Sequence, residues 1–338
     1  MGRLACLSLT CLVAVGCFGS SAAPKLPAAD AAVPAQLRIQ TFDGANPVIR
    51  AVPLEDYVRA TALSEFAPAS GDEALVEKML EVQAIISRTF AASHVGRHGR
   101  DGFDLCSTTH CQLFEPGRLK TSRWAPAASV AVERTSGMVL MFDGQPAQAL
   151  FHADCGGHTS SATSIWGGPG RSYLAPREDG GPASKAHSTW EYEVSIDALT
   201  RALNTDPKTR LSGKLHDVVV VERDGAGRAV EIGVRGSNTF QVRAEEFRQV
   251  LSRAFGPRTI KSTYFQIKRT GKVVTFSGKG YGHGVGLCQA GALARLTAGS
   301  KPYDVLKFYY PGTELAGARG PELGIRGSGF GFRRPFRS

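Results

Sequence analysis

The 338-residue sequence predicts an α+β fold in which helices are mixed with antiparallel strands. Residues 216–236 and 262–280 each have the pattern of two strands joined by a Gly-containing turn. Residues 71–96, in contrast, carry apolar side chains at helical spacing. Strands and helices do not alternate regularly along the chain, which argues against a doubly wound parallel sheet.

The first half of the folded region begins with strands and continues with helices. Residues 36–44 and 47–54 alternate in the manner of strands, and residues 54–66 predict a short helix. Residues 71–96 give the strongest helix signal, with Asp72 available as its cap. The apolar positions of this second helix recur at helical spacing: Leu75, Met79, Val82, Ile86 and Phe90.

The second half adds strand pairs and three helices. Residues 136–157 predict two strands around an Asp-Gly turn, ahead of the two strand pairs already named. Residues 243–256 predict an amphipathic helix that ends at Gly256. Two short helices, over 289–299 and 302–312, are expected to close the domain.

The amino terminus has the layout of an exported protein. Residues 1–22 contain one early Arg, an uncharged apolar run and then small residues, which predicts a secretory signal peptide cleaved after Ala22. The run is short for a membrane span, so no transmembrane segment is expected in the mature chain. Lipidation at Cys17 is an alternative. The expected location is the periplasm or the cell envelope.

Composition and charge bound the organisation and the partners. A Pro/Ala linker is expected over 23–36, one folded domain over 37–316 with a less certain subdomain at 190–275, and a basic, disordered Gly/Arg tail over 317–338. The formal charge of +10 would suit nucleic acid, but an exported protein seldom meets it, so an anionic envelope polymer is the better partner. The alternative is that the charge only aids solubility.

The predicted export also affects how the cysteines are interpreted. Three of the seven lie in the signal peptide, and four remain in the mature domain: Cys106, Cys111, Cys155 and Cys288. Disulfides are the default in an oxidising compartment. The two cysteines and the histidine of residues 104–114 nevertheless allow three interpretations: a disulfide loop, a metal site, or a nucleophile with its base.

A glycine-rich stretch stands near the carboxyl end. Glycines at every second position over 278–286 leave one face of the backbone bare, which permits close approach of another backbone or of a ligand. No Gly-Lys-Ser/Thr ends the stretch and no dinucleotide-binding unit surrounds it, so it is not a nucleotide-phosphate loop.

Four ordered motifs resemble those of the SpoIID/LytB family. Residues 278–315 are similar to its Gly-His-Gly-Val-Gly-(Met/Leu)-x-Gln-x-Gly-Ala run and its Tyr-Tyr-Pro-Gly-Thr ending. Residues 52–66, 81–91 and 151–168 resemble, in the family's order, its Pro-Leu-Glu-x-Tyr…Glu, Gln-Ala-x-x-x-Arg-Thr-Tyr-Ala and Cys-Gly-Gly…Trp-Gly segments. The resemblance runs from about Leu37 to Leu315 and implies a SpoIID-like α+β domain with an active-site cleft.

The resemblance implies a lytic transglycosylase, a lyase that cuts peptidoglycan between N-acetylmuramic acid and N-acetylglucosamine after the stem peptides have been removed. Carried over by motif, the general acid and base is Glu65. One carboxyl suffices because the sugar's own C6 hydroxyl attacks and closes a 1,6-anhydro ring, whereas ordinary glycosidases need two carboxyls. Such an acid must stay protonated through partial desolvation, with which Leu63 and Phe66 are compatible. The alternative is a solvated Glu at a helix end.

Further site residues follow from the same motifs. Arg88 would bind glycan or stabilise charge near Glu65, or else form a buried structural pair. Trp166 and Tyr281 would stack on sugar rings, or else be buried aromatics. His283 would contact substrate, or else bond to its own loop. The expected substrate-binding residues are Tyr281, His283, Gly284 and Gln289.

The resemblance also implies a structural zinc held by His98, Cys106, His110 and Cys111, with His94 as a substitute for His98. Four protein ligands would leave no open position for a reactive water. A Cys106–Cys111 disulfide is the alternative, and a thiol nucleophile is the least expected. Cys155 and Cys288 could pair as a disulfide or remain two buried thiols.

Two rival functions remain open. Some LytB-type relatives enhance amidases, so the chain could be a non-catalytic peptidoglycan-binding partner of a cell-wall amidase. A zinc-dependent cell-wall hydrolase is the second rival, and it would require an open position on the zinc.

Overall fold

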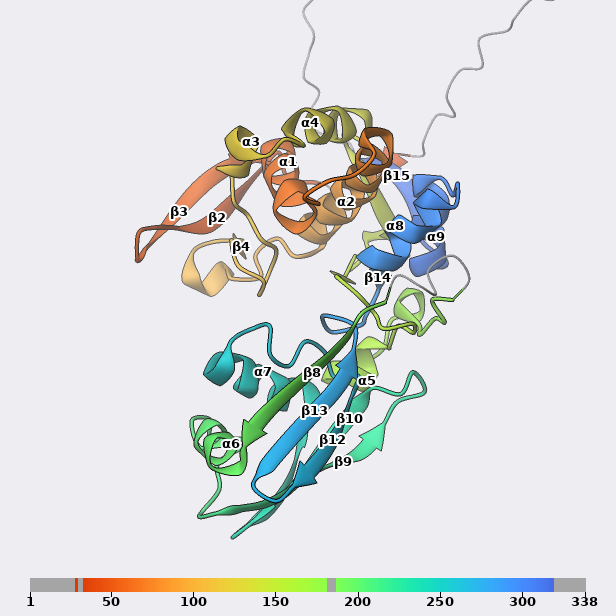
Figure 1. The fold of residues 1–338 in the computed structure, drawn as a ribbon. Coiled ribbons are helices and arrows are strands. Elements are labelled where there is room, and N and C mark those ends of the chain that lie inside the picture. The colour runs from red at the N-terminus through yellow and green to blue at the C-terminus, as the bar shows by residue number, and fades with distance from the viewer. Residues whose placement is uncertain (1–27, 30–32, 181–186, 319–338) are drawn as a thin grey trace, which may run out of the picture.

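The computed structural model describes residues 28–29, 33–180 and 187–318 (Figure 1). Helices and mainly antiparallel strands are mixed along the chain, which confirms the predicted α+β class. The predicted signal peptide, most of the linker and nearly all of the tail lie outside the described residues, so their boundaries stay predictions. Within the described ranges, no helix combines the length and the apolar character that a membrane span needs.

Figure 1 shows two parts, one mainly helical and one dominated by strands. We call residues 28–29, 33–180 and 281–318 the helical part and residues 189–279 the sheet part. The buried residues Trp190 to Phe276 form a hydrophobic core of the sheet part alone. Each part therefore has apolar contacts of its own.

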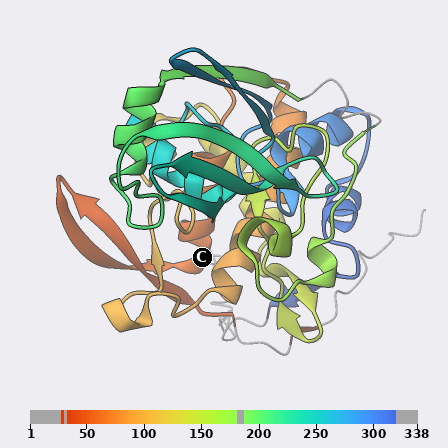
Figure 2. The same ribbon diagram turned by 90° about the horizontal axis from the view of Figure 1, so that it is seen from below.

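The helical part is built around α2 (Glu73–Ser93), which begins and is buried as predicted. The Asp72 side chain accepts a hydrogen bond from the Leu75 N–H at 2.9 Å and so caps the helix. Before it, β2 (Gln36–Asp43) and β3 (Asn46–Pro53) form the expected hairpin, which leads into α1 (Leu54–Glu65). Figures 1 and 2 both show this hairpin projecting at one edge of the molecule.

Further helices surround α2 and α1. They are α3 (Arg118–Thr121), α4 (Ala125–Arg134), α8 (Gln289–Thr297) and α9 (Pro302–Tyr309). The last two confirm the predicted closing helices, whereas α4 was not predicted from the sequence pattern. Because α2 contacts α1, α4, α8 and α9, it brings together segments from both ends of the described chain.

Short strands complete the helical part. In the sheet β1-β15-β5-β6, the turn between β5 (Met138–Phe142) and β6 (Gln145–Pro146) is the predicted Asp-Gly turn, with φ of 49° at Asp143 and 71° at Gly144. The other two strands of this sheet are β1 (Ala28–Ala29) and β15 (Glu314–Ala318). In addition, β4 (Leu105–Cys106) pairs with β2.

A two-stranded parallel pair joins two of the motif regions. β7 (Phe151–His152) pairs with β14 (Leu287–Cys288), with Phe151 opposite Leu287 and Cys288 opposite His152. β7 is followed by the Cys-Gly-Gly motif and then by α5 (Ala162–Trp166), and β14 leads directly into α8. Segments more than 130 positions apart therefore lie side by side.

The sheet part holds two three-stranded antiparallel sheets and two helices. Its elements are β8 (Thr189–Ser195), α6 (Ile196–Leu203), β9 (Leu215–Arg223), β10 (Ala229–Gly236), β11 (Thr239–Arg243), α7 (Ala244–Phe255), β12 (Phe265–Thr270) and β13 (Val273–Lys279). The β9–β10 hairpin, the β12–β13 pair and α7, which Gly256 caps, confirm the elements predicted from the sequence.

Candidate active site

Glu65 is the last residue of α1, and its side chain is half-buried. The Leu113 N–H donates a hydrogen bond to Glu65 Oε1 at 2.7 Å. The pKa of Glu65 is raised to about 7, mainly because the carboxyl is buried; the Leu113 N–H lowers the pKa and the nearby Glu115 charge raises it, and both effects are smaller than that of burial. No Lys or Arg forms an ion pair with Glu65 among the described residues. This carboxyl can therefore carry a proton near neutral pH.

The segment that follows Cys111 is bonded along α1, from its first turn to its last. Besides the Leu113 bond, the Glu115 N–H donates to Ser64 Oγ at 3.0 Å. Tyr57 donates its hydroxyl to Gln112 Oε1, also at 3.0 Å. The position of the Leu113 N–H against Glu65 thus depends on how residues 98–111 are held.

Gln289 approaches Glu65 from the first turn of α8. Its Nε2 donates to the Glu65 carbonyl oxygen at 3.2 Å and to Gln83 Oε1 at 3.0 Å, and Gln83 in turn donates to Ser87 Oγ. Among the predicted site residues, the structure thus brings Glu65 and Gln289 together. Gln83 was not among the residues predicted from the sequence, although an amide on the buried face of α2 is a signal that points to it.

The four predicted zinc ligands lie together. The ligand atoms of His98, Cys106, His110 and Cys111 are all within 4.8 Å of one another. The sulfur of Cys111 is 3.4 Å from His98 Nε2 and 3.8 Å from His110 Nδ1, and the sulfur of Cys106 is 3.7 Å from His110 Nδ1. Tetrahedral zinc with ordinary bond lengths separates sulfur and nitrogen ligands by about 3.6 Å. The residues therefore fit zinc.

The residues around this cluster also agree with a zinc site. His98 Nδ1 lies 3.7 Å from Asp101 Oδ2, in the place where a carboxylate commonly orients a metal-binding histidine. His94 is not part of the cluster, because its Nδ1 is bonded to the Phe90 carbonyl oxygen at 2.9 Å. The Cys106 and Cys111 sulfurs are not bonded to each other. The geometry favours zinc over the disulfide, and the ion itself stays a prediction.

Arg88 is placed away from Glu65. Its fully buried guanidinium donates to both oxygens of Glu55, from Nε at 2.9 Å and from Nη2 at 2.6 Å, and to the Met138 carbonyl oxygen at 3.1 Å. Among the described residues, none of the hydrogen bonds of Arg88 is to Glu65. The geometry therefore favours the buried structural pair, and a catalytic role for Arg88 has no contact that supports it.

His283 lies beside aromatic side chains on the glycine-rich stretch. Its Nδ1 accepts a hydrogen bond from the Val285 N–H at 3.0 Å, and its ring centroid is 5.0 Å from that of Trp166. Burial lowers the pKa of His283 to about 4, so the ring is neutral at pH 7. Trp166 and Tyr281 are 41% and 36% exposed. These exposed rings could stack on a sugar, but no recorded hydrogen bond links either of them to Glu65.

Glycines are required in this stretch because other parts of the same chain pack closely against its backbone. A Cβ on Gly284, where φ is +84°, would lie 2.4 Å from the Arg228 guanidinium. A Cβ on Gly286, where φ is +72°, would lie 2.0 Å from the Leu150 carbonyl oxygen. The bare face therefore admits other parts of the chain. Gly284, which the sequence predicts to bind substrate, is covered by Arg228 and accepts a hydrogen bond from the Ser160 N–H at 2.7 Å.

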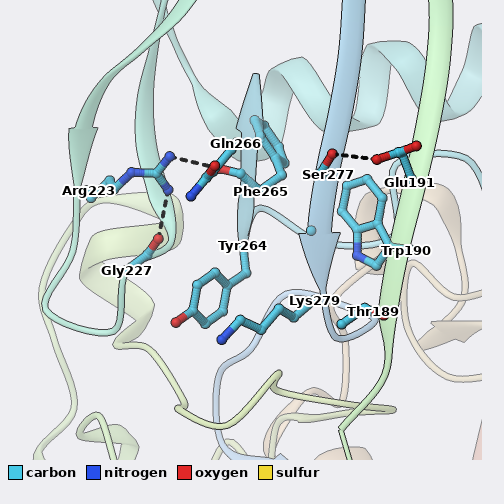
Figure 3. A pocket seen from close by; sticks show the side chains of 11 residues that line it. Thr189, Trp190, Glu191, Arg223, Gly227, Tyr264, Phe265, Gln266, Ser277 and Lys279 are labelled. Carbon is cyan, nitrogen blue, oxygen red and sulfur yellow. Dashed lines mark hydrogen bonds between the residues drawn. The ribbon is translucent and has the colours of Figure 1, made fainter. Parts of the chain in front are cut away.

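The sheet part contains a pocket of about 690 Å³ (Figure 3). Figure 3 shows the side chains of Trp190, Tyr264 and Lys279 around it, and Arg223 bonded to the carbonyl oxygens of Gly227 and Phe265 at 2.8 and 2.9 Å. None of the predicted site residues lines this pocket. It is distinct from the environment of Glu65.

Two family models match the chain. The SpoIID model, described as a stage II sporulation protein, matches residues 43–142, which include Glu65, Arg88 and the four predicted zinc ligands. A domain of unknown function, DUF8618, matches residues 170–286 and thus the sheet part with its flanks.

Relatives extend the similarity beyond residue 142. An uncharacterized protein of Brachyspira hyodysenteriae is 29% identical over 287 residues, which cover 79% of this chain and 68% of that protein. The stage II sporulation protein D of Bacillus subtilis is 25% identical over 315 residues, 88% of this chain and 84% of that protein. The amidase enhancer of Bacillus subtilis is 26% identical over 279 residues, 70% of this chain but only 37% of its own length.

Proposed function

The chain belongs to the SpoIID family, and on that premise we propose that it is a cell-wall protein that cleaves peptidoglycan glycan strands as a lytic transglycosylase. The proposed substrate is the peptide-free strand, cut between N-acetylmuramic acid and N-acetylglucosamine. The proposed site of action is the cell envelope, which agrees with the export predicted from residues 1–22.

The observation that carries the proposal is the single carboxyl of Glu65, whose pKa burial raises to about 7. A glycosidase that uses water or a covalent intermediate needs a second carboxylate across the bond. Glu115, the carboxylate whose charge acts on Glu65, forms an ion pair with Arg118 on the surface. One protonated carboxyl matches a reaction in which the same group first gives and then takes a proton.

In this reaction Glu65 donates its proton to the bridging oxygen, and the bond from that oxygen to C1 of the muramic acid breaks. The C6 hydroxyl of the same sugar attacks C1, and the Glu65 carboxylate takes the hydroxyl proton. The bond lost at C1 is replaced by the C1–O6 bond, no water is consumed, and Glu65 ends protonated. The products are a 1,6-anhydro-muramic acid end and a free C4 hydroxyl on N-acetylglucosamine.

Zinc at His98, Cys106, His110 and Cys111 would supply a cross-link and no reactive ligand, since four protein ligands close its coordination sphere. The cluster holds residues 98–111, and the next residues carry the Leu113 N–H that contacts Glu65. This donor set supports a positioning role and argues against the zinc-hydrolase alternative.

A second candidate function is a non-catalytic partner of a cell-wall amidase. Similarity to the amidase enhancer supports it, and the exposed Trp166 and Tyr281 rings could bind glycan without cleaving it. This alternative predicts that glycan binding does not depend on Glu65.

Mass spectrometry of peptide-free glycan strands incubated with the purified mature protein tests the proposal. The wild type and Glu115→Gln should release strands that end in 1,6-anhydro-muramic acid, and Glu65→Gln should release none. Intact strands that are recovered from all three proteins, yet bind to each, would favour the amidase partner. Products without the anhydro end would favour a hydrolase.

A further inference from the structure

A second group of metal-binding side chains lies between the helical part and the sheet part. The ligand atoms of Asp154, Cys155, His187 and Cys288 are all within 4.8 Å of one another. They come from three separate segments, after β7, before β8 and at the start of α8. We propose that these four residues form a second structural zinc site.

The histidine is oriented as a metal ligand. His187 Nε2 lies 3.2 Å from the Asp179 carbonyl oxygen, so this nitrogen can donate its proton outward. His187 Nδ1 then faces the cluster, 2.8 Å from Asp154 Oδ1 and 3.9 Å from the Cys155 sulfur. Metal-binding histidines commonly donate their second N–H to a backbone carbonyl in this way. A zinc ion would replace the proton that Nδ1 shares with Asp154, as metal binding displaces ligand protons.

Backbone N–H groups surround the two sulfurs. The Gly157 N–H donates to the Cys155 sulfur at 3.3 Å, in a turn where Gly156 and Gly157 have φ of 75° and 107°. The Cys288 sulfur accepts from the N–H groups of Cys155 and Gly291, at 3.2 and 3.3 Å. N–H donors of this kind can offset the negative charge of a sulfur that a metal ion holds as thiolate.

The carboxylate is held in the same manner. Asp154 Oδ2 accepts from the backbone N–H and the hydroxyl of Ser188, both at 2.8 Å, and Oδ1 also accepts from the Gly156 N–H at 2.8 Å. These bonds fix the Asp154 carboxylate, one oxygen of which lies within 4.8 Å of both sulfurs, and carboxylate ligands of metals are commonly held by such outer partners.

Buried charges next to the cluster balance an anionic ligand set. The buried Asp179 lies 3.3 Å from the Cys155 sulfur and is paired with Arg295 at 2.7 Å. The fully buried Arg228 donates to the Cys155 carbonyl oxygen at 2.6 Å. Two thiolates and two carboxylates are thus offset by two guanidinium groups and by the zinc ion itself.

A disulfide explains this arrangement less well than zinc. The two sulfurs are close but not bonded to each other, and a disulfide would give His187 and Asp154 no reason to face them. Two sulfurs, one imidazole and one carboxylate make up a four-ligand set of the kind that zinc accepts.

The location gives the site a role. It ties the segment before β8 to the end of β7 and to the start of α8. Gln289, the residue after Cys288, donates to the Glu65 carbonyl oxygen. Zinc here would therefore hold both the junction of the two parts and one wall of the environment of Glu65.

Zinc per chain, measured by elemental mass spectrometry on the full mature protein, tests the proposal without reference to activity. We expect two zinc ions in the wild type, and one in each of Cys288→Ser, His187→Ala and the matched control Cys111→Ser. The double variant Cys111→Ser/Cys288→Ser should contain none. A wild type with one zinc that Cys111→Ser removes, or a Cys288→Ser variant with as much zinc as the wild type, would overturn the proposal.

A second measurement needs no variant. Alkylation of the wild type in denaturant, with a chelator and without a reductant, should modify all four cysteines of the mature chain. A Cys155–Cys288 peptide pair that resists alkylation until a reductant is added would show a disulfide and overturn the site.

Discussion

The two ends of α1 carry carboxyl groups in opposite situations. Glu55, in the first turn, accepts two hydrogen bonds from the Arg88 guanidinium and a third from the Gly137 N–H at 3.3 Å. Glu65, ten residues later, accepts one hydrogen bond from the Leu113 backbone and lies near the negative charge of Glu115. The first also lies at the helix end that stabilises a negative charge, and the second at the end that does not.

The difference shows that partners decide what a carboxyl does. Glu55 has a cation and holds α1, α2 and the start of β5 together through Arg88 and Met138. Glu65 is half-buried and has no cationic partner within the part of the chain that the structure describes, so its proton is retained to about neutral pH. One end of the helix is structural and the other is available for proton transfer.

The largest expected effect tests the structural end. Arg88→Ala would leave Glu55 without its cation and lower the free energy of unfolding by about 3 kcal/mol, the lower end for a broken buried pair because Glu55 is 35% exposed. Arg88→Lys keeps the charge but loses the two-bond geometry, so its loss should be smaller. Urea unfolding measures both. A loss under about 1 kcal/mol for Arg88→Ala would contradict the structural pairing.

The next largest effect concerns Glu65, at the other end of α1, and is seen in the pH dependence of activity. Glu65 must be protonated to act first as an acid, so kcat/KM should be level below pH 7 and fall about tenfold per pH unit above it. Turnover on peptide-free strands at pH 9 should then be roughly 100-fold below that at pH 6. Circular dichroism at each pH checks that the protein remains folded. A rate that stays constant or rises up to pH 9 would contradict an acid role.

Stability should respond to Glu65 in the same pH range. The folded pKa of about 7 lies above the ordinary value of 4.5, so the folded state binds more protons between these values and the wild type loses stability as pH rises through them. Glu65→Gln should therefore raise the free energy of unfolding at pH 8 by about 1–3 kcal/mol and change little at pH 4. Urea unfolding at both pH values is the test. Equal stability at pH 8 would show that the carboxyl is not desolvated.

The smallest effect concerns Glu115. Its charge helps to raise the pKa of Glu65, so Glu115→Gln should move the descending limb of the pH profile to lower pH by a few tenths of a unit. A shift to higher pH would mean that Glu115 acts in some other way. Since Glu115 is paired with Arg118 on the surface, its replacement should leave the maximal rate nearly unchanged.

Much of the fold followed from local pattern. The cap at Asp72, the apolar spacing of α2 and the glycine-marked hairpins predicted their elements because those signals lie within a few turns or one strand pair. By contrast, the sequence pattern predicts that β7 belongs to the hairpin around the Asp-Gly turn, whereas in the structure β7 pairs with β14. A pairing across more than 130 positions leaves no trace in the local pattern.

The candidate sites also divide into residues that local sequence could predict and residues that only the folded chain brings together. His98, Cys106, His110 and Cys111 lie within fourteen positions, so spacing and family resemblance could predict that these four side chains lie together. Asp154, His187 and the two other cysteines come from three segments, and only the folded chain brings them together. Likewise, the sequence left Arg88 open between two roles, because nothing in it places Glu55 within reach of the guanidinium.

The most direct test is a carbon-13 NMR titration of the protein labelled at glutamate side-chain carboxyl groups, recorded from pH 4 to pH 9 beside Glu65→Gln. We predict one resonance that titrates with a pKa of about 7 and is missing from the variant. If the resonance that Glu65→Gln removes instead titrates in the ordinary range near 4.5, Glu65 is a solvated carboxylate, and the proposed acid of the transglycosylase is lost with it.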